Sequence, residues 1–426
     1  MIIDLTVSNF LSIKDKQTIS LFAERNVDKH TDNIAYLNTN YGTLKTCAVM
    51  GANASGKTNL LFAFKALGYL ITKTNRIDEK DNIKCYDPFL LSQETKNKPT
   101  LMELEFWLAN KRYKYSVTYD SHNIYKESLY FYPNLKPAKI FERISENNWK
   151  EGEGITFGTY LKGGKKQFAY FPNNSYLSIA GSSPEAPRIL KDVYSYFRDN
   201  WIFVNHTSNK IMSWEEDDIA RDVMKNLMCS IDLGISDFKF RDVELSNEQL
   251  EMLKKVPEEM QKDIKNHWSK EVVFSHVDQD GNSIELPPEL ESKGTARLFE
   301  TFPTFLVALK DGSVLFIDEI ESSYHSHVVE LLIKVFQDPD VNIHNAQLIF
   351  TTHNFNILKS SLMRKDQIWL AEKNKGMTTY SSLDEFDSSL RDNSPFEKWY
   401  DEGRLGGIPA LDYGSLSTSL KRIVKD

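Results

Sequence analysis

The segment GANASGKT, at positions 51–58, constrains the fold of this chain more than any other part of its sequence. It has the form G-x-x-x-x-G-K-[ST], in which glycines let the backbone curl so that successive N–H groups point at phosphate oxygens. An apolar run at 44–50 precedes it, and 59–70 follows with apolar residues at helical spacing. A chance match in a glycine-rich turn is the alternative. The order strand, glycine loop, helix favours a phosphate-binding loop, because the mechanism needs that context.

The residue types of this loop predict a nucleotide site that also holds a divalent cation. Lys57 is expected to reach the β- and γ-phosphates of ATP, and the Thr58 hydroxyl is expected to bind Mg²⁺. The helix that begins here adds the positive end of its dipole. Asn53, Gly56 and Asn59 are expected to complete the ATP-binding set of the loop. ATP and Mg²⁺ are therefore the predicted cofactors.

A second apolar strand ends in an acidic pair. The run VLFIDEIE, at 314–321, leads four apolar residues into Asp318 and Glu319. Asp318 could bind Mg²⁺ through water, and Glu319 could polarise the attacking water as a general base. The alternative is an acidic turn that only favours the start of a helix. The phosphate loop in the same chain shifts this choice toward catalysis.

A third strand, QLIFTTHN at 347–354, ends in a histidine. His353 is expected at the carboxyl edge of the sheet, where it could hydrogen-bond the γ-phosphate and sense it. A lone histidine is more often structural. Its position relative to the acidic pair favours the catalytic interpretation.

The segment ESKGTAR, at 291–297, precedes an apolar helix predicted from 298 to 309. Ser292 is a good N-cap, and Gly294 allows a close approach of the backbone. One interpretation is a helix cap alone. The other is a second phosphate-binding helix start, which would act on the nucleotide of a partner subunit.

The remaining segments predict an α/β fold with other material in the middle. Residues 1–22 read as strands, and 101–132 alternates around turns as an antiparallel meander. The polar stretch 136–167 predicts a surface hairpin or loop. It carries a small basic cluster, Lys162, Lys165 and Lys166.

From about Pro187 the chain is expected to be helical before the strand–helix order returns. Helix periodicity covers 215–231 and 246–268, and Pro257 interrupts the second helix. We therefore expect a first ATPase lobe with the meander at 1–135 and an insertion at 136–275. A second lobe at 276–380 and a C-terminal extension at 381–426 complete the expected domains.

The composition is that of an ordinary soluble globular protein, with 41% hydrophobic and 26% charged residues. At 426 residues the chain exceeds one typical domain, and its formal net charge of −8 offers no global basic field for nucleic acid. The three cysteines fit neither a metal site nor a disulfide framework. No signal peptide or membrane span is apparent, so a cytoplasmic protein without membrane contact is expected.

Six motifs give the chain a family resemblance. They are NFLSIKD at 9–15, GANASGKTNLL at 51–61, SKGTARL at 292–298, FIDEIESSYHSHV at 316–328, TTHN at 351–354 and GRLGGIP at 403–409. Together they resemble the ABC-type ATPase heads of the SMC, RecF and RecN class. More closely, the chain resembles the RloA-like AAA/ABC-type ATPase family of bacterial abortive-infection and anti-phage systems. The resemblance covers both ends of the chain and leaves 136–270 weakly matched.

The resemblance implies the fold of an ABC-type ATPase head. This is an α/β fold with a mixed sheet that carries the P-loop, an antiparallel β subdomain and, in this chain, a largely helical central insertion. Lys57 and Thr58 fall on the Walker A positions of the family. Asp318 and Glu319 fall on its Walker B pair, and His353 falls on its switch histidine.

The resemblance also implies a second subunit. Ser292 and Gly294 fall on the ABC signature, in which Glu291 replaces the usual leucine, and 322–325 falls on the D-loop region. In such heads two subunits sandwich two ATP molecules, and each signature faces the γ-phosphate held by the other subunit. A homodimer or higher assembly gated by ATP is therefore expected.

The function that follows is an ATPase that acts as sensor or scaffold and regulates a separate effector, a nuclease or toxin, in anti-phage defence. The related OLD nucleases continue into a Toprim domain, whereas only residues 354–426 follow His353 here and they carry no acidic cluster at strand ends. Cutting activity is therefore expected in a partner. One alternative is a RecF- or SMC-like repair or maintenance ATPase that binds DNA in an ATP-dependent manner. Another is a protein that binds ATP and barely hydrolyses it, against which the complete set Lys57, Asp318 and Glu319 argues.

Overall fold

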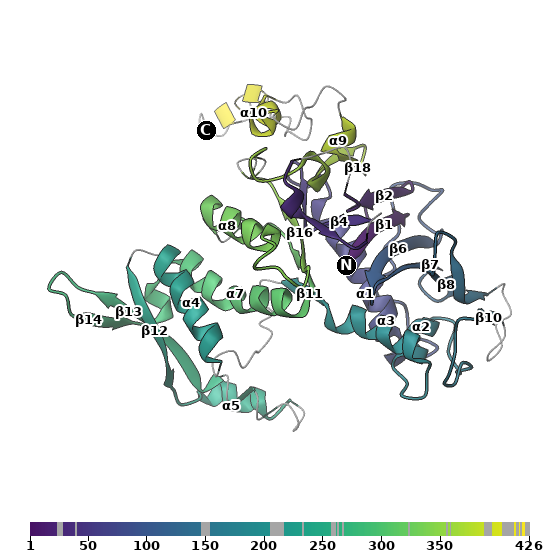
Figure 1. The fold of residues 1–426 in the computed structure, drawn as a ribbon, viewed down its shortest axis with the longest axis horizontal. Helices are drawn as coiled ribbons and strands as arrows, with labels where there is room; N and C mark the ends of the chain where they lie inside the picture. Colours follow the sequence, from purple (N-terminus) through teal and green to yellow (C-terminus); the bar gives the residue numbers. More distant parts are fainter. Residues whose placement is uncertain are drawn as a thin grey trace. The chain divides into compact units, whose positions relative to one another are not determined.

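The computed structural model describes most of the chain as two compact units (Figure 1). The described residues are 1–23, 29–38, 41–145, 154–204, 217–231, 234–256, 261, 264–265, 268–322, 324–354, 357, 359–386, 394–402, 413–414, 417 and 420–421. One unit comprises Asp199–Ile349 with Met1 and is called the middle unit. The other comprises Ile2–Arg198 and Phe350–Asp426 and is called the terminal unit.

A seven-stranded antiparallel sheet dominates the terminal unit, in the spatial order β10-β9-β8-β7-β6-β1-β2. Its strands are β1 (Ile2–Ser8), β2 (Gln17–Ser20), β6 (Thr100–Leu108), β7 (Lys111–Tyr119), β8 (Ile124–Tyr132), β9 (Ala138–Ile144) and β10 (Ile155–Phe157). The consecutive pairing of β6, β7 and β8 confirms the predicted meander. Ala109 and Asn110, with φ of 47° and 59°, form the two-residue turn between β6 and β7, as a type I′ hairpin requires.

Helix α3 (Arg188–Asp199) packs on the inner face of this sheet. Its buried residues recur at helical spacing, which gives the helix one apolar side. The Phe106 ring of β6 stacks on the Tyr196 ring of α3, with ring centroids 5.4 Å apart, and meets Phe197 edge-on. This aromatic contact forms the core between meander and helix.

A smaller set of strands in the terminal unit carries the glycine loop. Strand β5 (Thr46–Met50) pairs in parallel with β17 (Ile368–Asn374), which pairs antiparallel with β18 (Met377–Ser382). The hairpin of β3 (Ile34–Tyr36) and β4 (Gly42–Leu44) lies earlier in the chain. The helices of the unit are α1 (Lys57–Lys73), α2 (Tyr176–Gly181), α9 (Leu383–Phe386) and α10 (Phe396–Asp401), with 3₁₀ turns η1 (Thr31–Asn33), η2 (Thr74–Arg76) and η6 (Lys365–Gln367).

The middle unit combines a parallel strand pair with a three-stranded antiparallel sheet, in the order β12-β13-β14. Strand β11 (Trp201–Val204) runs parallel to β15 (Val314–Ile317). The other elements are α4 (Asp218–Ile231), β12 (Ile235–Asp242), α5 (Asn247–Leu253), β13 (Lys270–Val277), β14 (Ser283–Leu286), η4 (Pro288–Leu290), α7 (Lys293–Asp311), α8 (Ser326–Gln337) and β16 (Gln347–Thr352). The boundary between the units falls within β16.

The small sheet packs against helix α7 through aromatic rings. Phe299 of α7 meets Phe238 of β12 and Phe274 of β13 edge-on, with ring centroids 5.0 and 5.2 Å apart. Strands β11, β12 and β13 were not predicted in the central insertion, which the sequence had indicated to be largely helical. Helix α4 agrees with the helix predicted at 215–231, and α5 covers only the start of the one predicted at 246–268; Pro257 lies outside the described residues.

These elements confirm the predicted α/β class. The expected domain boundaries near 135, 275 and 380 stay a prediction, since compactness divides the chain after Arg198 and after Ile349. None of the helices in the described part of the chain combines the length and the apolar character needed to cross a bilayer. All three cysteines are free, and burial raises the pKa of the Cys47 thiol to about 12.

Candidate nucleotide-binding site

Strand β5 leads directly into the glycine loop, and helix α1 begins at Lys57. All β5 residues are buried, as expected for a central parallel strand. Gly56 precedes the helix with φ of 107°, a backbone conformation that favours glycine. A Cβ atom at this position would lie 2.3 Å from Oγ1 of Thr378. The predicted order of strand, loop and helix is therefore confirmed, and both conformation and space require glycine at position 56.

The Lys57 side chain folds back over the loop that precedes it. Its Nζ donates hydrogen bonds to the carbonyl oxygens of Gly51, at 2.8 Å, and Ala52, at 3.0 Å. Only 6% of the residue is exposed. The loop therefore holds a buried positive charge beside its own backbone. An anion bound there would be attracted strongly, because water screens this charge little.

The loop has the chemistry to accept a phosphate group. No side chain caps the amino end of α1, since the residue before it is Gly56. The Ser55 hydroxyl is buried and has no hydrogen-bond partner in the described structure. An uncapped helix start beside a buried hydroxyl and the Lys57 ammonium suits an anion with several acceptor oxygens.

Side chains from both ends of the sequence hold this loop in place. The Thr378 hydroxyl, on β18, donates to the Ser55 carbonyl at 2.7 Å and lies 2.7 Å from the Ser12 hydroxyl. The Tyr380 hydroxyl donates to the Gly56 carbonyl at 2.8 Å. Asn59, predicted to contact the nucleotide, donates from Nδ2 to the Ser12 hydroxyl at 2.5 Å. These four side chains form the loop brace.

Asn9 explains why the motif at 9–15 accompanies the glycine loop. Its buried side chain donates to the carbonyls of Thr95 and Lys98 and accepts from the backbone N–H of Phe89, at 2.9 Å. These bonds fix the chain just before Ser12, a member of the loop brace. Three members of the brace, Ser12, Thr378 and Tyr380, were missed by sequence reasoning, because Ser12 and Thr378 lie 366 positions apart.

In the middle unit, the acidic pair follows β15 as predicted. All four β15 residues are buried, while Asp318 and Glu319 are half-buried. Glu319 has φ of 48°, in the left-handed region that residues other than glycine rarely adopt. The N–H of Ser322 donates to the Glu319 carbonyl at 2.8 Å and closes the turn. Backbone strain at a charged residue is typical of functional sites.

Ser292 caps helix α7, as the sequence predicted. Its Oγ accepts from the backbone N–H of Thr295 at 3.0 Å and lies 2.7 Å from the Thr295 hydroxyl. Glu291, which stands where the ABC signature has leucine, bonds through its carboxylate to Nε2 of His276 at 2.5 Å. Glu291 is thus bonded to the three-stranded sheet of the middle unit, because His276 belongs to β13.

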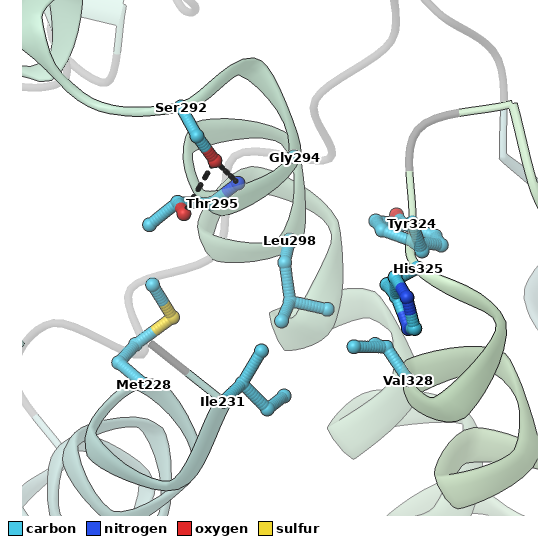
Figure 2. A pocket seen from close by; sticks show the side chains of 9 residues that line it. All are labelled: Met228, Ile231, Ser292, Gly294, Thr295, Leu298, Tyr324, His325 and Val328. Carbon is cyan, nitrogen blue, oxygen red and sulfur yellow. Dashed lines mark hydrogen bonds between the residues drawn. The ribbon is translucent and has the colours of Figure 1, made fainter. Parts of the chain in front are cut away.

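A cavity of about 260 Å³ opens beside this helix start (Figure 2). Ser292, Gly294 and Thr295 line one side, and Tyr324, His325 and Val328 line the other. The apolar side chains of Met228, Ile231 and Leu298 also contribute to its lining. The structure thereby brings the predicted signature next to the segment predicted as the D-loop, with α4 as a third wall.

His353 follows β16, as predicted, and is exposed. It lies in the terminal unit together with Asn53, Gly56, Lys57, Thr58 and Asn59. The middle unit holds Ser292, Gly294, Asp318 and Glu319. Each group is placed within its own unit, so the joint action of both groups on one nucleotide stays a prediction. The motif at 403–409 lies outside the described residues.

A buried strand, a phosphate-accepting glycine loop and a lysine at the start of the next helix define a P-loop nucleotide-binding protein. A family model matches residues 47–359, and the chain belongs to that family, described as "AAA domain, putative AbiEii toxin, Type IV TA system". The predicted membership of an AAA/ABC-type ATPase family is thereby confirmed. No protein with a curated description matches the chain.

Among solved structures, the chain is similar to an SMC head domain from Thermotoga maritima, with 13% identity, a TM-score of 0.40 and coverage of 89% of this chain and 98% of that one. It is also similar to an SMC head bound to the C-winged helix domain of ScpA. That match has 12% identity, a TM-score of 0.43 and coverage of 89% and 97%.

Proposed function

We propose that this chain binds ATP with Mg²⁺ at the glycine loop and hydrolyses it, and that its ATP state regulates a separate effector, a nuclease or toxin, in anti-phage defence. The observation that carries the proposal is the loop itself, with Lys57 held over the carbonyls of Gly51 and Ala52 and the buried, unpartnered Ser55 hydroxyl nearby. Membership of an AAA-domain family supports nucleotide binding.

The residue roles follow from the chemistry of each side chain. Lys57 exchanges its carbonyl partners for β- and γ-phosphate oxygens, and Thr58 supplies a hydroxyl to Mg²⁺. Asp318 supports the cation through water, and Glu319 accepts a proton from the attacking water. His353 hydrogen-bonds the γ-phosphate from the end of β16.

Assembly is the second part of the proposal. Ser292 and Gly294 start a helix that can face the γ-phosphate held by a second copy of the chain. The signature and the D-loop segment line the same cavity, so a displacement of one segment can alter the packing of the other. The family description names a putative toxin of a type IV toxin–antitoxin system, which supports a role of the chain in a system of that kind.

Hydrolysis is tested by measuring phosphate release from ATP by the purified chain and by Lys57→Ala. We expect the wild type to hydrolyse ATP and the variant to lose at least about 100-fold in rate, because one charged contact to the transition state contributes roughly 3 kcal/mol. Lys65→Ala, an exposed lysine on the same helix, is the matched control. Equal rates in all three proteins would refute the proposed site.

Gating is tested with Glu319→Gln, which keeps the shape of the side chain and removes the base. We expect this variant to bind ATP without turnover and to shift to a larger assembly, measured by light scattering after size exclusion. An assembly state that is the same with and without ATP, in both wild type and variant, contradicts gating. The effector role is tested by phage plaque counts in cells carrying the chain with its neighbouring genes, where Lys57→Ala should abolish protection.

A further inference from the structure

The basic cluster of Lys162, Lys165 and Lys166 belongs to a larger surface, which includes residues distant in the sequence. Gly163 and Gly164, with φ of 71° and 63°, form a tight turn flanked by exposed Lys162 and Lys165. The N–H of Lys165 donates to the Glu185 carbonyl at 2.8 Å. The turn therefore packs against the segment that opens helix α3.

Helix α3 adds two cations to this turn. The Arg188 side chain is 91% exposed, and the Lys191 ammonium donates to the Pro184 carbonyl at 3.2 Å. We call the set the lysine-loop surface. It comprises the cations Lys162, Lys165, Lys166, Arg188 and Lys191 and the neighbouring carboxylates Glu185 and Asp192.

Positive charge dominates the lysine-loop surface although the chain as a whole carries −8. Lys165 pairs with Glu185, and Arg188 pairs with Asp192, each at 3.5 Å. Within the described part of the chain, Lys162 and Lys166 have no ion-pair partner. Exposed pairs of this kind contribute little stability and exchange readily for other anions, so all the cations can serve a polyanion.

Two aromatic rings accompany these cations. Tyr160 is 52% exposed, and its ring is fixed edge-on against the buried Phe131 at 5.0 Å between centroids. Phe168 lies under the Lys165 ammonium, 5.3 Å from its ring centroid. A ring supported from below and open above is the arrangement on which a flat base can stack, at low cost in side-chain entropy.

We propose that the lysine-loop surface binds single-stranded nucleic acid. Clustered cations can follow a phosphate backbone, and the exposed Tyr160 ring can stack an unpaired base. A duplex hides its base faces, whereas a single strand offers both phosphates for the cations and open base faces for the ring. Single-stranded DNA and RNA share the chemistry that the surface recognises, and the experiment below separates them.

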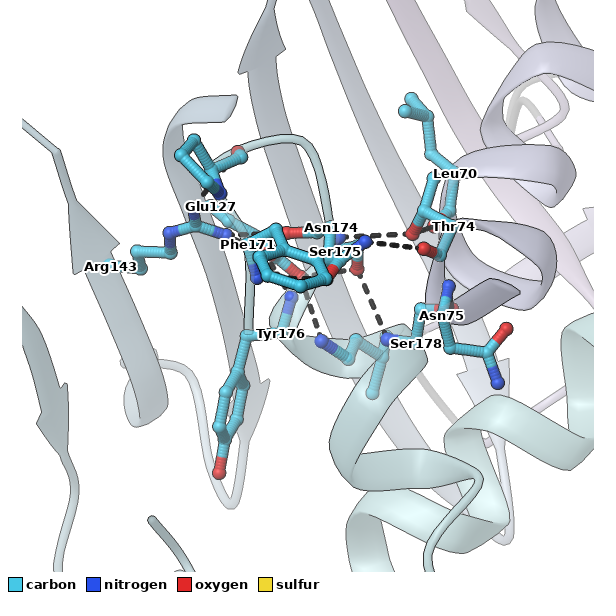
Figure 3. A network of polar contacts seen from close by, with 12 residues as sticks. Leu70, Thr74, Asn75, Glu127, Arg143, Phe171, Asn174, Ser175, Tyr176 and Ser178 are labelled. Carbon is cyan, nitrogen blue, oxygen red and sulfur yellow. Dashed lines mark hydrogen bonds and ion pairs between the residues drawn. The ribbon is translucent and has the colours of Figure 1, made fainter. Parts of the chain in front are cut away.

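A polar network leads from Tyr176 to Thr74, at the end of the helix that starts at Lys57 (Figure 3). The Tyr176 hydroxyl donates to the Lys166 carbonyl at 2.6 Å, and its backbone N–H donates to the buried Glu127 carboxylate at 2.7 Å. Asn174 and Ser175 then bond to Thr74, just beyond the end of α1. The bonds to Glu127 and Thr74 are buried, and buried networks of this kind have little freedom to rearrange one bond at a time. Binding of single-stranded nucleic acid can therefore change the position of α1 and, through it, the glycine loop. This step rests on the proposed function.

Binding is measured by fluorescence anisotropy on the full chain without ATP, using labelled dT20, U20 and a 20-base-pair duplex. We expect a single strand to bind about tenfold more tightly than the duplex. The logarithm of affinity should fall with the logarithm of salt at a slope of about −2 to −3, for roughly three to four phosphates contacted. No binding to either single strand, or equal binding to the duplex, overturns the proposal.

Variants locate the surface. Combined Lys162→Glu, Lys165→Glu and Lys166→Glu should weaken binding by at least about tenfold and flatten the salt slope. The matched control reverses the exposed Lys80, Lys84 and Lys98 of the same unit and should bind as the wild type does. Equal losses in the two triple variants contradict the proposal.

The aromatic part has its own test. Tyr160→Ala should weaken binding to single strands about tenfold, and Tyr160→Phe should restore it, because stacking needs the ring and not the hydroxyl. Thermal melts of each variant show whether it is folded. These measurements contain no ATP, so they can succeed even if the chain fails to hydrolyse ATP. Conversely, an active ATPase that binds no strand refutes only this inference.

Discussion

The glycine loop and the acidic turn both follow fully buried strands, yet their backbones are held in different ways. At the loop, the left-handed residue before the helix is Gly56, and the loop brace holds the surrounding carbonyls. At the turn, the left-handed residue is Glu319 itself, with φ of 48°. Glycine at position 56 therefore adopts its conformation without strain, although Ala54 in the same loop has φ of 63°, whereas the turn stores roughly 1–3 kcal/mol at its acidic residue.

This difference separates two ways of building a site. A preformed loop loses little entropy when an anion binds, so its substitutions should affect binding and folding together. A strained turn is tolerated for its chemistry, so relieving the strain should improve folding while activity is lost. The following predictions probe each side of that contrast.

Gly56→Ala should have the largest effect. The new Cβ would meet Thr378 Oγ1 at 2.3 Å and would also force alanine into a left-handed conformation. We expect ATP affinity to fall more than about 100-fold, since a displaced loop loses several kcal/mol of preorganised contacts. Gly281→Ala is the control for strain alone, since its φ is 83° and nothing lies within 4 Å of the added atom. Calorimetric titration measures the ATP affinity of each variant, and thermal melts measure its stability. Equal losses in Gly56→Ala and Gly281→Ala would contradict the role of the clash.

Thr378→Val should have the second-largest effect. The change keeps the side-chain shape but removes the bonds to the Ser55 carbonyl and the Ser12 hydroxyl, both buried. We expect a loss of about 2 kcal/mol in unfolding free energy and weaker ATP binding, because the buried Ser55 carbonyl loses its donor, while Ser12 keeps its bond from Asn59. Thr379→Val, exposed on the same strand, should change neither quantity. Urea unfolding gives the comparison, and an unaffected Thr378 variant would show that the brace is dispensable.

Tyr380→Phe should cost about 1 kcal/mol, the usual contribution of one hydrogen bond. It should also change the response to alkali. Burial raises the pKa of Tyr380 above its ordinary 10.0, so the folded chain keeps this proton where the unfolded chain loses it. That stability is fully present below pH 10 and is lost as pH rises further. The variant should therefore lose stability less steeply above pH 10 in denaturant melts, and parallel pH profiles would contradict this account.

Glu319→Gly should have the smallest effect on folding, and in the opposite direction. Glycine adopts a φ of 48° freely, so we expect a gain of about 0.5 kcal/mol after its greater freedom in the unfolded chain is subtracted. Glu319→Gln keeps the strain and should leave stability unchanged. ATP hydrolysis should be lost in both variants. A glycine variant less stable than the glutamine variant would show that the turn is not strained.

Much of the fold could be predicted because local patterns determined it. The meander follows from alternation and from turn residues such as Ala109-Asn110, and the strand–loop–helix unit follows from the glycine spacing. Strands β12 and β13 were missed because each lies beside segments with helical periodicity. Their phenylalanines become a core only against Phe299 of α7, a contact that short-range patterns do not contain.

The candidate site divides in the same manner. Lys57, Ser292 and the acidic pair lie where their motifs predicted, because each motif is set by neighbouring residues. The loop brace could not be predicted, because it depends on tertiary contacts between the two ends of the sequence. Only the lysines of the lysine-loop surface at 162–166 could be predicted from the sequence. Arg188 and Lys191 join it because the bond from the Lys165 N–H to the Glu185 carbonyl holds the turn against the segment before α3.

The span between Ser12 and Thr378 has a consequence for how the protein is made. At roughly 5–20 residues per second, a ribosome adds Thr378 about 20–70 s after Ser12, which lies 366 positions earlier. During that interval the glycine loop exists as sequence but lacks the hydroxyl that fixes its Ser55 carbonyl. We therefore expect a nascent chain that lacks Thr378 to bind nucleotide less tightly than the chain that contains it. Nucleotide binding is then expected late in biosynthesis, and translation products that end before Thr378 are expected to lack ATPase activity.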